Sequence, residues 1–316
     1  MNETLFSQVQ RLFERTYAQV GINLEDCLID RSRCAQLSIL AGKSARELSE
    51  LARTFLRQAG DQLYVGIYYS RWLIEELERH DPRAGLSDRN IRSLIMFVEE
   101  INHALHAALQ FKCGSREIAS EDFARNLELQ AQVDTYLVLL LFVAFFRKTQ
   151  RVSRTDRRWL RFHLFARQCP EAFRDKNLRG RYLETSQLAA SYTHYLDTLN
   201  GQRRLDEIRR FHSLDYGAKR ERILALTDRG ANECSSLGRL SAFQHIEIGD
   251  VLRPTHGTLV SYQSVFAQNE NRNAVEFSHD LACQRFISRY TGDAGQQINS
   301  VRRTPQLNQL LGFGEV

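Results

Sequence analysis

The sequence predicts a mainly α-helical protein with one short strand element and a small α+β region at its C-terminal end. Three observations predict this class. Apolar residues recur at helical spacing through most of residues 1–228. Residues 62–69 are instead aromatic and β-branched, as strands are. From about residue 229 the pattern becomes alternating and is interrupted by Pro and Gly, so we expect a helical domain over residues 1–228 and a smaller α+β or extended region over residues 229–316.

The first predicted elements are helices followed by a strand. Helical spacing of apolar residues begins at Leu5 and continues over residues 37–57. Residues 62–69 are predicted to form a strand, and a helix over residues 71–80 follows it directly. We expect that helix to end before Pro82, because proline disfavours helical geometry in the residue that precedes it.

Two long helices are predicted in the middle of the chain. An apolar stripe runs through residues 87–111, with Asp88 as a candidate N-cap and Gly114 as a stop signal. The next helix is expected to open with acidic residues near residue 121 and to close at Lys148, the polarity that the helix dipole favours. Further helices are predicted over residues 155–168, 178–200, 203–213 and 217–227.

The C-terminal region carries the α+β prediction. Residues 245–253 alternate between apolar and polar side chains, and residues 258–266 are a second candidate strand. One further helix is expected over residues 275–291.

Arginine dominates the basic residues of the chain. Basic residues outnumber acidic ones, 43 to 38, which gives a formal net charge of +5. The lysines are Lys43, Lys112, Lys148, Lys176 and Lys219. An arginine-rich chain suits phosphate or carboxylate recognition, because the planar guanidinium binds both groups through paired hydrogen bonds. Arginine-favouring coding bias explains the same composition without any function, so composition leaves both explanations open.

Several classes of protein have no support in the sequence. The six cysteines are scattered without a CxxC pair, and the N-terminus lacks a basic region followed by an apolar run. The longest apolar run, Tyr136 to Phe146, is about half of the ~20 residues that a spanning helix needs. Nucleotide-binding glycine motifs and Ser or Cys triad motifs are absent. These features predict a cytoplasmic, reducing location without membrane insertion.

The pattern with the clearest chemical meaning lies in the predicted helix over residues 87–111. Glu99 and His103 are four residues apart, so a helix places them on one side, and Glu100 follows Glu99 directly. Glu128 belongs to the next predicted helix, where it begins the sequence Glu-Leu-Gln-Ala. Carboxylate and imidazole groups are ligands of divalent metals, which makes these residues a candidate metal site.

This arrangement resembles a minimal gluzincin, a small metallopeptidase with a strand, an HExxH helix and a later helix that carries ExxA. The resemblance covers about residues 60–148. It implies that Glu99, His103 and Glu128 bind the metal and that Glu100 is the general base that activates a metal-bound water. It also implies that the predicted strand is the active-site edge strand.

Glu99 departs from that family, which has histidine at this position. Two carboxylates and one imidazole favour Mn²⁺ or Fe²⁺ while still accepting Zn²⁺. The added negative charge acidifies a metal-bound water less, which weakens hydrolysis. The predicted function is therefore a zincin-like cytosolic protein, either a weak metal-dependent peptide-bond hydrolase or a catalytically degenerate relative.

The same residues fit other interpretations. On an ordinary solvated helix, Glu99 and His103 form a pair that contributes only a few tenths of a kcal/mol. His106, about one turn further on, is either a substitute ligand or a residue at the edge of the core. A second ExxH at residues 276–279 allows a di-iron interpretation with residues 100–103. Its remaining carboxylates are drawn from Glu75, Glu76 or Glu128.

The alternative function rests on arginine-rich faces. If one helix continues through them, a single basic stripe is formed by Arg147, Arg151, Arg154, Arg158 and Arg161. Further basic pairs are Arg203–Arg204, Arg209–Arg210 and Lys219–Arg220. These residues predict a non-enzymatic helical interaction protein that binds an acidic partner or nucleic acid. The plainer interpretation is a solvated surface balanced by acids such as Asp156, Asp206, Glu207 and Glu221.

Overall fold

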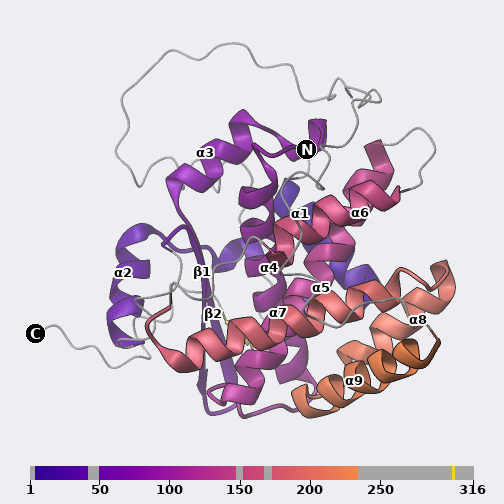
Figure 1. Cartoon of the computed structure of the whole chain (residues 1–316). Helices are drawn as coiled ribbons and strands as arrows, with labels where there is room; N and C mark the ends of the chain where they lie inside the picture. The colour runs from indigo at the N-terminus through magenta and orange to yellow at the C-terminus, as the bar shows by residue number, and fades with distance from the viewer. Residues whose placement is uncertain (1–3, 42–49, 147–151, 167–172, 234–300, 303–316) are drawn as a thin grey trace, which may run out of the picture. The chain divides into compact units, whose positions relative to one another are not determined.

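The computed structural model describes residues 4–41, 50–146, 152–166, 173–233 and 301–302. Within these residues the chain is mainly helical, as predicted, and it contains one β-hairpin (Figure 1). The α-helices are α1 (Leu5–Thr16), α2 (Arg31–Leu40), α3 (Arg71–Arg79), α4 (Ile91–Lys112), α5 (Glu121–Phe146), α6 (Arg154–Arg161), α7 (Lys176–Leu196), α8 (Gly201–His212) and α9 (Tyr216–Glu233).

Short polar residues begin many of these helices. Ser153 caps α6 with a complete capping box: its hydroxyl accepts from the Asp156 N–H at 3.1 Å, and the Asp156 carboxylate accepts from the Ser153 N–H at 3.0 Å. The same kind of side-chain cap is formed by Thr4, Asp30, Ser70, Asp175 and Asn200. Each cap satisfies main-chain N–H groups that have no partner within the helix.

The described residues also contain three shorter helical turns. Two are 3₁₀ turns, at Leu24–Cys27 and Pro82–Ala84. The third is a π-helical turn, Phe162–Ala166, which continues directly from α6. The predicted helix over residues 155–168 is therefore regular only as far as Arg161.

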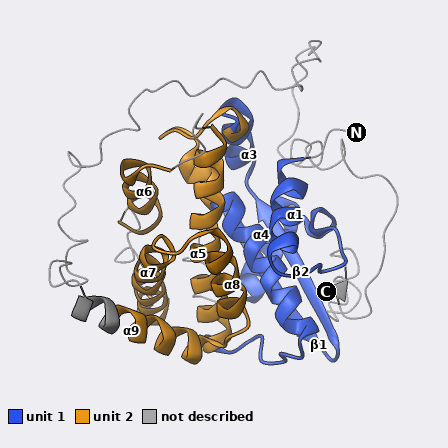
Figure 2. Ribbon diagram, turned by 90° about the vertical axis from the view of Figure 1, so that its right-hand side faces the viewer, with its two compact units in different colours: residues 1–81, 96–120, 263–316 blue, residues 82–95, 121–262 orange. Residues whose placement is uncertain are grey.

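Contacts group the chain into two compact units (Figure 2). Unit 1 comprises residues 1–81, 96–120 and 263–316, and unit 2 comprises residues 82–95 and 121–262. The first residues of α4 belong to unit 2 and the rest of that helix belongs to unit 1.

Unit 1 contains the hairpin of β1 (Ala52–Ala59) and β2 (Gln62–Tyr69). The two strands are antiparallel, with Ala52 paired to Tyr69 and Ala59 paired to Gln62. Gly60, in the two-residue loop, has a φ of 56°, a left-handed conformation that glycine adopts at little cost. A short strand, β3 (Val301–Arg302), pairs with β2 in parallel.

The helical prediction for residues 37–57 is wrong in part. Helix α2 ends at Leu40, and β1 begins at Ala52. The reason is pairing: β1 matches the whole length of β2 across the tight loop, so the hydrogen-bonded ladder overrides the local helical spacing. The strand predicted over residues 62–69 is confirmed as β2.

The core of unit 1 forms on both sides of the hairpin. Ile29, Leu37, Tyr64 and Tyr68 make one buried cluster between α2 and β2. Phe6 of α1 packs edge-on against other aromatic rings of the unit, with ring centroids 5.9 Å from Phe97 and 6.4 Å from Tyr69. These contacts attach the hairpin and α1 to α4.

The core of unit 2 is made by α5, α7, α8 and α9. Its buried residues include Leu129 and Val133 of α5, Tyr192 of α7 and Phe211 of α8. The rings of Tyr192 and Phe211 stack with centroids 4.0 Å apart.

Among the described residues, helix α5 has the length and the apolar composition that a membrane-spanning helix needs. Its most apolar window has a mean hydropathy of 1.7, and 72% of that window is buried inside the structure. The burial comes from contacts with α6, α7 and α9. The central helix of a protein core has the same composition, and α5 occupies that position in unit 2.

The predicted α+β region lies mostly outside the described residues. The strands expected at residues 245–253 and 258–266 and the helix expected at residues 275–291 all fall there. The domain boundary near residue 229 therefore stays a prediction.

Candidate functional site

The hairpin fixes α4 at the motif that the sequence analysis identified. The Tyr69 hydroxyl donates to the Phe97 carbonyl at 2.8 Å, and the Thr54 hydroxyl donates to the Glu100 carbonyl at 3.1 Å. Burial, and then the charge of Glu100, raise the pKa of the Tyr69 hydroxyl well above its usual value. The phenol therefore stays protonated and continues to donate to α4 over the physiological range of pH.

Glu100 and His103 form a largely buried pair on α4. A carboxylate oxygen of Glu100 lies 3.7 Å from Nδ1 of His103, and the two side chains are 14% and 16% exposed. At this separation the contact is electrostatic rather than a hydrogen bond. The residue predicted as general base thus lies against the imidazole predicted as a metal ligand.

Glu128 lies on α5, where it acts on a residue of α7. Burial lowers the pKa of Arg181, but a hydrogen bond and the charge of Glu121, together with the charge of Glu128, raise it above its usual value overall. The carboxylate of Glu128 therefore contributes to the charge balance of unit 2.

Within the part of the chain that the structure describes, no group of three or more His, Cys, Asp or Glu side chains could hold a metal ion. Glu99 and His103 belong to unit 1 and Glu128 to unit 2. The metal site of Glu99, His103 and Glu128, with Glu100 as base, therefore stays a prediction, as does its Zn²⁺, Mn²⁺ or Fe²⁺ cofactor.

The residues of the other metal interpretations have structural surroundings of their own. His106 is 1% exposed, and its ring lies 5.0 Å from Tyr17 and 6.4 Å from Phe13, centroid to centroid. It is therefore a core residue of unit 1, the second of the two roles expected for it. Glu75 lies 2.5 Å from Arg71 in an ion pair. The second ExxH, at residues 276–279, falls outside the described residues.

The basic residues are distributed differently from the sequence prediction. Val152 and Ser153 are not helical, so a single helical stripe from Arg147 to Arg161 is wrong; Arg147 and Arg151 themselves lie outside the described residues. Lys219 is fully buried and is not part of a basic surface. Arg204 donates to the carbonyls of Leu196 and Leu199 and thereby caps the end of α7.

Several of the other arginines are paired with acids inside unit 2. Arg125 binds both Glu121 and Glu184, and Arg220 binds Glu184 at 3.0 Å. Arg222 binds Glu207 through two nitrogens, at 2.7 and 2.5 Å. Much of the arginine excess therefore serves to join α5, α7, α8 and α9.

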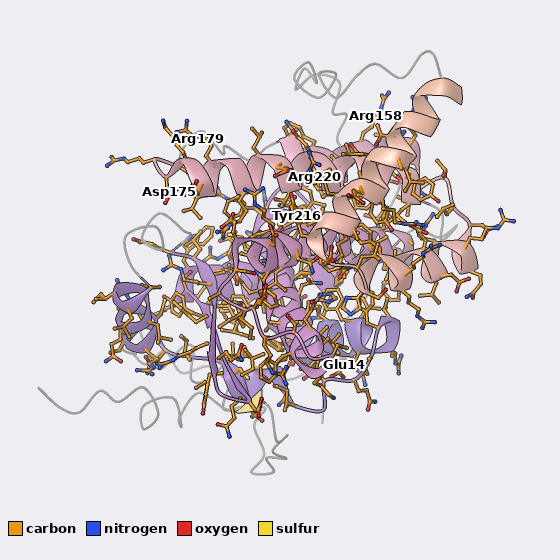
Figure 3. All side chains as sticks on the ribbon, turned by 90° about the horizontal axis from the view of Figure 1, so that it is seen from below. Glu14, Arg158, Asp175, Arg179, Tyr216 and Arg220 are labelled. Atoms are coloured by element: carbon orange, nitrogen blue, oxygen red, sulfur yellow. The ribbon has the colours of Figure 1, made fainter. Side chains whose placement is uncertain are left out.

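Helix α6 carries a basic surface in addition to these pairs. We call it the arginine corner: Arg154, Arg157, Arg158 and Arg161 of α6 together with His194 of α7. Arg157 and Arg161 both bind Asp197, whose side chain is 12% exposed. Arg154 and Arg158 are exposed, and neither has a carboxylate partner among the described residues (Figure 3 labels Arg158).

The pKa of His194 reports the electrostatic balance of this corner. Burial, and then the charges of Arg161 and Arg154, lower the pKa of His194 from 6.5, against the opposing charge of Asp197. Histidine next to an excess of positive charge gives up its proton more easily. Two of the charges that lower this pKa, Arg161 and Arg154, belong to α6, and Asp197 opposes them.

A buried polar cluster joins α5 to α9. The Lys219 ammonium donates to Gln130 Oε1 at 2.7 Å and lies 5.0 Å from the centre of the Phe211 ring. Gln130 donates to Asp134 at 3.1 Å. Burial lowers the pKa of Lys219 from 10.5 to about 7, although the charges of Asp134 and Asp215 act in the opposite direction.

This cluster was not predicted from the sequence, which instead placed Lys219 in a basic surface pair with Arg220. A signal was present, because Asn126, Gln130 and Asp134 follow one another at intervals of four on the apolar helix α5. Polar residues at that spacing share one side of a helix and need a polar partner when that side is buried.

No family model, no curated protein and no solved structure matches this chain. The gluzincin resemblance therefore stays a prediction.

Proposed function

We propose that this protein is a non-enzymatic helical interaction protein that binds an acidic partner through the arginine corner. The observation that carries the proposal is the exposed pair Arg154 and Arg158, which stands beside two further arginines and has no carboxylate partner in the described residues. Guanidinium groups bind carboxylates and phosphates through paired hydrogen bonds, so such a surface suits an acidic ligand.

The arginines of α6 also act on His194 of α7. Burial is the main cause of the lowered pKa of His194, and the charges of Arg161 and Arg154 lower it further. Asp197 neutralises only the inner part of the corner, since it binds Arg157 and Arg161. The outer arginines are left to bind a partner.

The test measures binding of the full chain to three polyanions: polyglutamate, a single-stranded DNA oligonucleotide and vesicles that contain phosphatidylserine. We expect at least one to bind with an affinity that falls as salt rises, since charged contacts release counterions. The Arg154→Gln/Arg158→Gln variant should bind roughly 25-fold more weakly, since each charge contributes about 1 kcal/mol, or about fivefold.

The matched control is Arg203→Gln/Arg209→Gln, which removes two exposed arginines from α8 instead. It should bind nearly as well as the unchanged chain. Failure of all three polyanions to bind, or equal losses in the two variants, would contradict the proposal.

The second candidate is the metal-dependent peptide-bond hydrolase or its degenerate relative. The observation that favours it is the way β1 and β2 donate hydrogen bonds to α4 at Phe97 and Glu100, next to the Glu100–His103 pair. In the gluzincin arrangement a strand and the motif helix are likewise neighbours. Glu99, His103 and Glu128 would hold the ion, and Glu100 would accept the proton of a bound water.

Metal content separates this candidate from the first. The purified chain and a Glu99→Ala/His103→Ala variant are each loaded with Zn²⁺, Mn²⁺ or Fe²⁺, and the bound metal is measured. A metal site at these residues predicts binding that the variant loses, and zinc affinity that rises in Glu99→His. Equal metal content in all three proteins would remove the candidate.

A further inference from the structure

The end of α5 exposes large apolar side chains. Leu141 is 51% exposed and Phe145 is 64% exposed, and the two are four residues apart, so they lie on one side of the helix. We call this pair the apolar tip. Phe146 supports it from the interior, with its ring 5.3 Å from that of Phe145 and 6.5 Å from that of Phe142.

The arginine corner lies close to the apolar tip along the chain and in the fold. Helix α6 packs on α5, and the Arg161 guanidinium at the end of α6 lies 5.0 Å from the centre of the Tyr136 ring. Residues 147–153 alone join Phe146 to Arg154, and an extended chain spans at most about 3.6 Å per residue. Helix α6 therefore lies beside the C-terminal half of α5, the half that ends in the apolar tip.

We infer that the acidic partner of the arginine corner is an anionic lipid surface, into which the apolar tip inserts. This inference rests on the proposed function and names its partner. Exposed Phe and Leu side chains enter the boundary between headgroups and acyl chains, while adjacent basic residues attract anionic headgroups. Neither contact alone binds stably, but the two together act on one surface.

The chemistry of the tip favours lipid over other acidic partners. Phe145 could stack on a nucleic-acid base, but the aliphatic Leu141 gains little from such a contact. A second copy of this chain would cover the tip, but it would also bring two arginine corners of the same charge together. Only a partner that is both apolar and anionic satisfies the tip and the corner.

The experiment is co-sedimentation of the full chain with vesicles of phosphatidylcholine alone and of phosphatidylcholine mixed with phosphatidylserine. Binding is expected to the mixed vesicles and to weaken with salt. Arg154→Gln/Arg158→Gln should reduce the affinity roughly 25-fold, from about fivefold for each arginine near an anionic surface. Leu141→Ser/Phe145→Ser should reduce it roughly tenfold or more, through lost apolar burial.

The control variant is Leu183→Ser/Leu224→Ser. It removes two other exposed apolar residues of unit 2, which are 43% and 39% exposed. Its lipid binding should equal that of the unchanged chain. Far-ultraviolet circular dichroism of each variant checks that the helices remain folded.

The outcomes separate this inference from the proposed function. Binding to DNA or polyglutamate without binding to vesicles would overturn the lipid partner and leave the arginine corner as an anion-binding surface. Vesicle binding that persists in Leu141→Ser/Phe145→Ser would also overturn the inference, because the tip would then be unused. Failure to bind any polyanion would overturn both.

Discussion

The two long helices, α4 and α5, are held by different kinds of interaction. On α4, neutral hydroxyl groups of Tyr69 and Thr54 donate to main-chain carbonyls, and aromatic rings pack around Phe97. These contacts involve no net charge on the donor or the acceptor. The attachment of α4 should therefore depend little on pH or salt.

On α5, charged side chains make the equivalent contacts. The Tyr136 hydroxyl donates to Asp197, which also binds Arg157 and Arg161. Lys219 donates to Gln130 within the same core. Because charge inside a protein must be paired, removing one partner exposes the full cost of burying the other. The comparison predicts that unit 2, unlike unit 1, responds strongly to pH and to loss of single charges.

The largest expected effect is the loss of Asp197. Asp197→Ala leaves Arg161, whose side chain is 10% exposed, without its carboxylate, and it removes the acceptor of the Tyr136 hydroxyl. We expect the free energy of unfolding to fall by about 3–5 kcal/mol, the usual cost of breaking a buried ion pair from one side. Urea unfolding followed by circular dichroism measures it.

Asp206→Ala provides the control for that measurement. Asp206 is exposed on α8, and its change should alter stability by less than about 0.5 kcal/mol. Similar values for the two variants would mean that the Asp197 cluster does not hold α5 and α7 together.

The next effect is a pH dependence that comes from Lys219. Its pKa is lowered to about 7 in the folded chain, mainly by burial, from 10.5. Between these two values the unfolded chain binds a proton that the folded chain does not, so stability should rise with pH. The expected slope is about 1.4 kcal/mol per pH unit for one proton. Below about pH 7 this contribution should level off.

Lys219→Met isolates that slope. The variant keeps a long side chain against Phe211 but has no group that titrates in this range. Urea unfolding measured at several pH values from about 7.5 to 9 should show the rise in the unchanged chain and a nearly flat profile in the variant. Equal slopes in the two proteins would place the titration elsewhere.

The same contrast explains how much of the molecule could be predicted from sequence. β2 and α4 were predicted because their patterns are local: a run of aromatic and β-branched residues, and an apolar stripe at helical spacing. β1 was missed because its strand geometry depends on pairing with β2 rather than on its own residues.

The candidate site shows a similar limit. Helical spacing predicted that Glu99, Glu100 and His103 share one helix, and all three lie on α4, where Glu100 contacts His103. Spacing says nothing about which residue of another helix comes near Glu128, and the structure brings it near Arg181. Lys219 and Arg220 are adjacent in sequence, yet one is buried and the other exposed, because only tertiary packing distinguishes them.

A smaller effect on stability is expected from a hydrogen bond that attaches α4 to the hairpin. Tyr69→Phe removes the hydroxyl that donates to the Phe97 carbonyl and keeps the ring. The free energy of unfolding should fall by about 1 kcal/mol, the typical value of one hydrogen bond. The loss should be the same at low and high salt, and the same at every pH between roughly 6 and 8. A loss that changes with salt would remove the distinction between α4 and α5.

The smallest expected effect tests the motif itself. Glu100→Gln removes the charge beside His103 while keeping the size of the side chain, and a pair at this helical spacing contributes about 0.2–0.5 kcal/mol. Urea unfolding should therefore detect almost no change, although Glu100 and His103 are as buried as Asp197. A loss of 2 kcal/mol or more, roughly the cost of an unpaired buried charge, would show that α4 too depends on charge. In that case the difference between the two helices would be one of degree, and the carboxylate–imidazole pair would stabilise α4 itself.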